Sequence, residues 1–175
     1  ATAHALVTLI IAGLIGLTTR EPRKAAFAAA YIVGAEVLWR MTSARVFYEI
    51  GKYAVIAVLG ICFLRIPKRQ GILLPALYFV LLTFSIPLTL TGMDLGAARQ
   101  YISFNLSGPL CLAVSAIFFR QIDLTNGDRK ILVGRFVAPL VGMSAVIVYG
   151  IAGAGEIVFT SDSNFVTSGG FGPNQ

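Results

Sequence analysis

Residues 71–82 read GILLPALYFVLL, and together with AVIAVLGICFL at residues 54–64 they decide the fold. Neither run contains a charged residue, and neither shows the polar face that recurs at helical spacing in soluble proteins. Runs of this kind are typical of helices that lipid surrounds on all sides. A soluble helical bundle is therefore the weaker interpretation, and the sequence predicts an all-α, polytopic bundle of transmembrane helices.

The composition agrees with this prediction. Hydrophobic residues make up 57% of the 175 residues, charged residues make up 13%, and the mean hydropathy is +0.81. Soluble domains carry about 25% charged residues, so a soluble core does not account for this much apolar surface in so short a chain. The net charge of +6 does not indicate nucleic-acid binding, because the basic residues lie in short loops between apolar runs and no nucleic-acid motif is present. Membrane lipids are the expected surroundings.

Six apolar segments come close to the roughly 20 residues that a helix needs to cross the hydrocarbon core. The predicted spans are residues 3–18, 25–39, 46–64, 71–91, 101–119 and 131–153. The remaining residues, 154–175, are polar and rich in Gly and Ser. Since the chain starts at Ala1 without a basic leader segment and stops just after a Gly-rich stretch, we expect a fragment of a longer protein with further spans.

The charges of the loops predict an orientation. Nine Lys or Arg residues lie in the connections 19–24, 65–70 and 120–130, whereas the opposite connections hold only Arg40, Arg45 and Arg99. Cytoplasmic loops of membrane proteins carry an excess of Lys and Arg. The three basic loops are therefore predicted to be cytoplasmic, residues 154–175 periplasmic, and the chain a multi-pass protein of a bacterial inner membrane.

The stretch most indicative of function is residues 36–52, which read EVLWRMTSARVFYEIGK. Glu36 and Arg40 are four residues apart, as are Arg45 and Glu49, so each pair is predicted to form an ion pair on one helix. Charges placed inside the apolar boundary, such as Glu36 and Lys52, are costly unless they are paired or face water, and by default they indicate function.

Two interpretations of this stretch remain open. One is an interhelical clamp, with Trp39 and Tyr48 as anchors at the membrane interface. The other is a positively charged pocket that accepts an anionic headgroup such as a lipid-linked diphosphate.

Helix-breaking residues are predicted at the same depth as these charges. Ser85-Ile-Pro87 interrupts the fourth predicted span, and Asn105-Leu-Ser-Gly-Pro109 interrupts the fifth. Ordinary proline kinks explain both, but irregular backbone beside charges also favours a cavity open to the periplasm, which Arg99 could join.

The remaining cysteine, arginine and histidine side chains do not indicate a particular function. Cys62 and Cys111 lie in apolar runs without a second ligand at metal-binding spacing, so no metal site is predicted. Arg135 is interpreted as a side chain that extends toward the cytoplasmic interface. His4, the single histidine, receives no role.

The end of the chain, residues 168–175, reads SGGFGPNQ. These are turn-forming residues, and an external loop is the plain interpretation. After an apolar hairpin, this stretch also resembles the entry to the conserved domain of the O-antigen ligase and O-antigen polymerase superfamily. The motif residues are Gly169, Gly170, Gly172, Pro173 and Asn174. Residues 36–52 resemble the N-terminal half of ligase-like proteins of that superfamily.

The resemblance implies part of an inner-membrane glycosyltransferase that moves a glycan from undecaprenyl diphosphate to lipid A-core or another acceptor. It implies no cofactor, metal or nucleotide; the partners would be a lipid-linked glycan donor and a lipid or glycan acceptor. The catalytic residues are expected beyond Gln175. Under this hypothesis Arg40, Arg45 and Arg99 hold the diphosphate, because a guanidinium can bind it in a bidentate manner. Glu36, Glu49 and Lys52 orient them through ion pairs. An O-antigen polymerase, a transporter or flippase of lipid-linked glycans, and a scaffold subunit remain alternatives.

Overall fold

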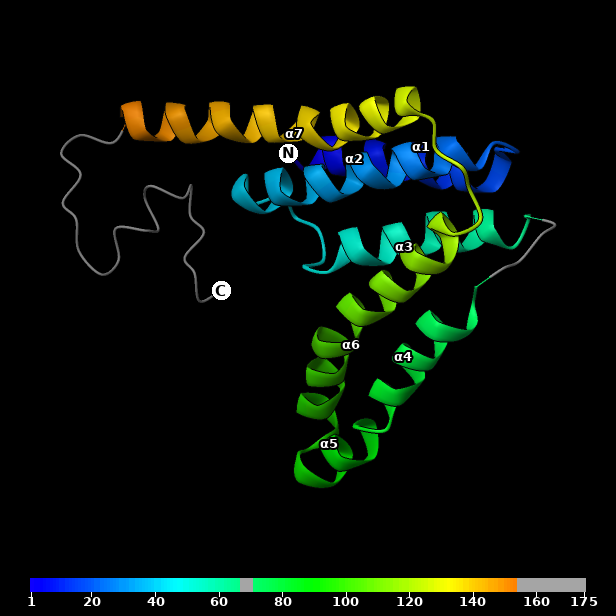
Figure 1. Ribbon diagram of the computed structural model, residues 1–175. Helices are drawn as coiled ribbons and strands as arrows, with labels where there is room; N and C mark the ends of the chain where they lie inside the picture. The colour runs from blue at the N-terminus through cyan, green and yellow to red at the C-terminus, as the bar shows by residue number, and fades with distance from the viewer. Residues whose placement is uncertain (67–70, 154–175) are drawn as a thin grey trace.

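The computed structural model describes residues 1–66 and 71–153, and every regular element within those ranges is an α-helix. The helices are α1 (Thr2–Thr18), α2 (Pro22–Met41), α3 (Ile50–Phe63), α4 (Leu73–Thr83), α5 (Ile86–Gly92), α6 (Leu95–Phe119) and α7 (Asn126–Gly153). Helix α2 packs against α1, α3 and α7, while α4, α5 and α6 form a hairpin that slants away from this group (Figure 1). The hairpin is joined to the group mainly where α6 crosses α3.

The first helices lie where the sequence predicts them, and their ends follow from local chemistry. Helix α2 begins at Pro22, a residue that fits the first helical turn because its missing N–H needs no partner there. Helix α7 begins five residues before the predicted span. Thr125 and Asp128 explain this early start, because each donates a backbone N–H to the side chain of the other, at 2.9 and 3.2 Å, and so caps the helix.

Helix α3 begins at Ile50 rather than at the predicted Val46. Residues 42–49 instead form a turn in which Ser43 has a φ of 50°, in the left-handed region. The backbone N–H of Ala44 donates to the carbonyl of Trp39 at 2.9 Å and closes this turn. Arg45 and Glu49 are therefore not on one helix, which removes the basis for the predicted ion pair between them.

Helix α6 begins six residues before the predicted fifth span. The Asp94 carboxylate accepts hydrogen bonds from the backbone N–H groups of Gly96 and Ala97, at 2.8 and 3.2 Å, and caps the helix. Arg99 consequently lies inside α6 and not in a loop.

One of the two predicted helix breaks is confirmed. The fourth span is divided at Phe84 and Ser85, and Pro87 lies in the first turn of α5. The predicted break at residues 105–109 is wrong, because α6 continues through Pro109 as one helix.

Small side chains form most of the core among α1, α2 and α3. Buried alanines allow these helices to approach closely, which is how helices associate in lipid. They are Ala5, Ala12, Ala25, Ala26, Ala29 and Ala35. The largest buried side chains, Trp39, Ile32, Leu59 and Phe118, fill the space between them. Trp39 is 1% exposed, so its predicted role as an interface anchor is wrong.

The surface of the remaining helices confirms a membrane-associated, all-helical class. Three helical segments, Leu73–Gly92 (α4 and α5 together), α6 and α7, are long and apolar enough to cross a membrane, and only 0%, 17% and 6% of their most apolar windows are buried. A soluble bundle would cover such surfaces. The described residues thus give three candidate spans, fewer than the six that the sequence predicts.

The other three predicted spans differ in length or charge. Helices α1 and α3 are apolar but shorter, in part because α3 starts late. Helix α2 has 20 residues, but these include Arg23, Lys24, Glu36 and Arg40. The predicted segment 154–175 lies outside the described residues.

The contact between α2 and α7 gives a direct test of this packing. A Cβ atom at Gly34 would overlap the carbonyl oxygen of Phe136. We expect Gly34→Ala to lower the stability of the protein by about 1–3 kcal/mol, because the added methyl group forces two helix backbones apart. Gly134→Ala is the matched control, since a Cβ atom there meets no other atom within 4 Å. Thermal unfolding in lipid nanodiscs, followed by circular dichroism, measures both, and equal midpoints would contradict the packing described.

Candidate functional site

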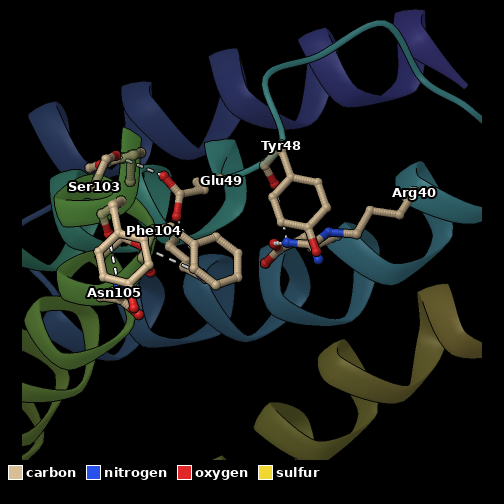
Figure 2. Close-up of polar contacts among 11 residues, drawn as sticks. Arg40, Tyr48, Glu49, Ser103, Phe104 and Asn105 are labelled. Atoms are coloured by element: carbon tan, nitrogen blue, oxygen red, sulfur yellow. Dashed lines mark hydrogen bonds and ion pairs between the residues drawn. The ribbon is translucent and has the colours of Figure 1, made fainter. Parts of the chain in front are cut away.

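The candidate site lies at the end of the molecule that contains the 42–49 turn, which we call the turn end (Figure 2). The opposite end, formed by residues 19–21 and 120–125, is called the basic end. An ion pair between Arg23 and Asp128, at 3.2 Å, joins the first turns of α2 and α7 at the basic end. Most of the polar residues predicted as functional gather at the turn end, where α2, α3 and α6 meet.

Arg40 is engaged by groups of the protein itself. Its guanidinium forms the predicted ion pair with Glu36, one turn earlier on α2. It also donates to the carbonyl oxygen of Tyr48 at 3.1 Å and lies 3.9 Å from the centre of the Tyr48 ring. The Nε atom is buried and has no hydrogen-bond partner among the described residues. These contacts show that Arg40 fixes the 42–49 turn onto the end of α2, as the clamp interpretation requires.

Glu49 is the most deeply buried acidic side chain at this end, with 4% of the residue exposed. Its carboxylate accepts hydrogen bonds from Ser103 Oγ at 2.9 Å and Ser107 Oγ at 2.7 Å, both from α6. The Lys52 Nζ atom lies 3.6 Å away and forms the ion pair. A buried carboxylate is tolerated when such partners compensate for lost hydration, so Glu49 holds α6 against the start of α3.

The predicted pair between Arg45 and Glu49 is therefore wrong, since Lys52 is the partner of Glu49. The Arg45 side chain is exposed and makes no ion pair within the described ranges. Its backbone N–H donates to Thr2 Oγ1 at 3.0 Å, which ties the turn to the start of α1.

Lys52, on α3, contacts both the Glu49 carboxylate and α6. Its Nζ donates to Ser107 Oγ at 3.3 Å and lies 5.6 Å from the centre of the Phe104 ring. A Cβ atom at Gly51 would overlap the Glu36 carboxylate, so the Glu36–Arg40 pair of α2 lies directly against the start of α3. The charged residues thus form one belt that runs from α2 across α3 to α6.

A cleft of about 560 Å³ opens beside this belt, between the 42–49 turn and the first half of α6. Its lining residues are Phe47, Tyr48, Glu49, Gly96, Arg99, Gln100, Ser103 and Phe104. Three aromatic rings and one exposed guanidinium therefore surround a carboxylate whose position is fixed by hydrogen bonds. Arg40 and Arg45 do not line the cleft.

The predicted site residues fall into three groups according to their contacts. Glu36 and Arg40 form one pair, Glu49 and Lys52 form another, and Arg99 lies on the cleft beside Glu49. Arg45 stands apart from all of them. The motif residues of the 168–175 stretch lie outside the described residues.

Two serines of α6 that the sequence does not indicate complete the belt. Ser103 and Ser107 were not predicted as partners of a charge, although their spacing of four residues places them on one face of a helix. The predicted helix break at residues 105–109 separates Ser107 from Ser103, whereas the continuous helix α6 places both beside Glu49. The Tyr53 hydroxyl, 2.8 Å from Ser103 Oγ, extends the same network.

His4 also has a role that the sequence did not indicate. Its Nδ1 accepts the indole N–H of Trp39 at 2.9 Å, and its Nε2 lies 2.9 Å from the Tyr31 hydroxyl. These contacts satisfy the polar atom of a buried tryptophan and join α1 to α2. The acceptor role of Nδ1 fits a neutral ring with its proton on Nε2.

Comparison of the chain with protein-family models, with curated proteins and with solved structures finds no match.

The belt can be tested by removing its two serines one at a time. Ser107 is 3% exposed and contacts both Glu49 and Lys52, so Ser107→Ala removes one partner from the buried Glu49 carboxylate and one from the partly exposed Lys52 ammonium group. We expect a loss of about 1.5–3 kcal/mol of stability, the usual value for a hydrogen bond to a charged group. Ser103→Ala is the matched control. It removes a bond to the same carboxylate at a half-buried position, where water can replace it.

Chemical denaturation of both variants in the same detergent measures the difference. Equal losses, or a larger loss for Ser103→Ala, would contradict the assignment of Ser107 as the central group of the belt.

Proposed function

We propose that this chain is the donor-binding part of an inner-membrane glycosyltransferase similar to O-antigen ligases. It would hold a glycan linked to undecaprenyl diphosphate while the glycan is moved to lipid A-core or another acceptor. The observation that carries the proposal is the cleft at the turn end, where Arg99, aromatic rings and a fixed carboxylate face one space.

Arg99 is the group best placed to bind the diphosphate. Its side chain is exposed on the cleft, and within the described ranges no carboxylate forms an ion pair with it. A guanidinium presents paired N–H donors that match phosphate oxygens, and its charge does not titrate at physiological pH. The diphosphate is also the leaving group, so a fixed positive charge beside it would favour cleavage of the glycosyl bond.

The rest of the cleft suits a glycan attached to that diphosphate. The rings of Phe47, Tyr48 and Phe104 give the apolar wall that small-molecule sites usually have, and Ser103 and Glu49 add a few oriented polar groups. The Glu49 charge would repel a diphosphate if it were free. Lys52 and the two serines compensate for it, which leaves the carboxylate able to accept a hydrogen bond from a sugar hydroxyl.

The contributions of the other two arginines differ from that of Arg99. Arg40 holds Tyr48 in place and is proposed to position the cleft wall instead of touching the donor. Arg45, exposed at the same end, adds positive charge that attracts an anionic headgroup from a distance.

The proposal includes the finer membrane arrangement of six spans in a bacterial inner membrane. Its support is that the shorter apolar helices α1 and α3 pack with α2, which itself packs against the candidate span α7. The basic end would be cytoplasmic by the positive-inside rule, and the cleft would then face the periplasm, where lipid-linked glycans are transferred.

The proposal predicts a specific effect of Arg99 on use of the donor. In the full-length protein, Arg99→Ala should lower kcat/KM for the lipid-linked donor by about 10- to 100-fold, the equivalent of one or two charge-assisted hydrogen bonds. Arg99→Lys keeps the charge but not the bidentate geometry and should recover part of the loss. Arg129→Ala, at the basic end, is the control and should transfer glycan normally.

Glycan transfer in proteoliposomes that contain the donor and an acceptor measures these effects. Normal transfer by Arg99→Ala with normal expression would reject the role of Arg99. Movement of the donor across the bilayer without any transfer would reject the enzyme in favour of a transporter.

A further inference from the structure

A second cavity, of about 480 Å³, lies away from the cleft, between α1, α2 and α7. We call it the α1–α7 groove. Ile11, Ile15 and Phe27 provide much of its apolar lining, and Lys24 and Arg135 provide two positive charges. None of these residues takes part in the proposed donor-binding function.

The packing of α2 and α7 shows how deep Arg135 lies. The Arg23–Asp128 ion pair and the contact of Gly34 with the carbonyl of Phe136 show that the two helices run in the same direction. Arg135 is therefore level with the middle of α2, about 10 Å along the helix axis from Asp128 at a rise of about 1.5 Å per residue. It lies within a helix that is long and apolar enough to cross a membrane.

A charge at this depth needs compensation. An arginine inside the hydrocarbon region costs several kcal/mol unless it is paired or reaches water or a headgroup. The Arg135 side chain is exposed, and in residues 1–66 and 71–153 no carboxylate lies within ion-pair distance of it. Its compensating group is therefore not an acidic side chain of the described part of the chain.

The side chains of Lys24 and Arg135 are both directed toward the basic end of the groove. Helical side chains lean toward the N-terminus of their helix, which is the basic end for both α2 and α7. The Arg135 guanidinium therefore leans toward Lys24. Lys24 pairs with Glu21 at 2.9 Å, but both side chains are more than half exposed, and such surface pairs are weak and exchange readily with other anions.

We infer that the α1–α7 groove binds one anionic phospholipid from the leaflet at the basic end. Its phosphate is held by Arg135 and Lys24, and one acyl chain lies along the apolar wall of α1 and α2. The observations that carry this are a largely apolar cavity between α1, α2 and α7 and two cations in its lining. One of these cations, Arg135, lies about 10 Å along α7 from Asp128 and forms no ion pair within the described residues. The inference does not depend on the proposed glycosyltransferase function.

Native mass spectrometry of the purified full-length protein tests the inference. Phosphatidylglycerol is the anionic probe and phosphatidylcholine the zwitterionic one. Arg135→Ala should weaken phosphatidylglycerol binding about tenfold, the equivalent of about 1.4 kcal/mol for one lost phosphate contact, and Arg135→Lys should restore part of it. Arg129→Ala, on the same helix but not in the groove, is the matched control and should bind as the unchanged protein does.

A second variant tests the acyl-chain half of the site. Ala28 lines the groove, so Ala28→Phe should fill it and reduce the binding of both lipids while leaving the two cations in place. Inorganic phosphate should not displace bound phosphatidylglycerol at equal concentration.

Three results would overturn the inference. One is unchanged phosphatidylglycerol binding in both Arg135→Ala and Ala28→Phe, which would show that Arg135 extends to the aqueous interface without a ligand. Another is equally strong binding of inorganic phosphate, which would show an anion site without an acyl chain. The third is a dimer that loses its stability in Ala28→Phe, which would show that a second copy covers the groove.

Discussion

The close approach of α2 to its neighbours is the constraint on which the rest of the structure depends. Lipid gives helices no hydrophobic reason to associate, so they hold together only where backbones come near enough for extensive van der Waals contact. Alanines supply that contact toward α1 and α3, and Gly34 supplies it toward α7. Because Gly34 fixes the level of Phe136 relative to α2, it also fixes the level of its neighbour Arg135. One small residue thus determines the level of a charge along the bundle.

The polar belt joins the hairpin to the other helices. The hairpin of α4, α5 and α6 has no buried residue in α4 or α5, and it meets the bundle through α6 and α3. At that crossing the carboxylate of Glu49 is shared among Lys52, Ser103 and Ser107. A buried charge is a weak source of net stability, but removing one of its partners is costly, so the arrangement specifies how the hairpin docks. The cleft beside Arg99 exists because the hairpin docks in this way.

The sequence predicted the helices well and the contacts between them less well, for separable physical reasons. Hydropathy identifies apolar segments, and α1 agrees with its predicted span to within one residue. Helix ends depend on single capping groups, and Asp94 and Thr125 moved the starts of α6 and α7 outward.

The predicted site was partly right for the same reasons. The Glu36–Arg40 pair was predictable because both residues lie on one helix. The Arg45–Glu49 pair was not formed because spacing by four implies contact only in a helix, and Ser43 turns the chain there. The serines facing Glu49 come from a segment more than 50 residues away, and no local pattern places them beside it. The sequence predicts six spans and the described residues give three candidate spans, because hydropathy alone does not account for the short lengths of α1 and α3 or for the charges within α2.

The contact between His4 and Trp39 gives the protein a built-in optical reporter. Trp39 is the only tryptophan in the 175 residues, so all indole fluorescence comes from the interior of the α1–α2 pair. Its N–H depends on the lone pair of His4 Nδ1, which a proton would occupy. Emission from this single residue therefore reports, without a label, whether α1 and α2 remain packed and whether the hydrogen bond between Trp39 and His4 is intact.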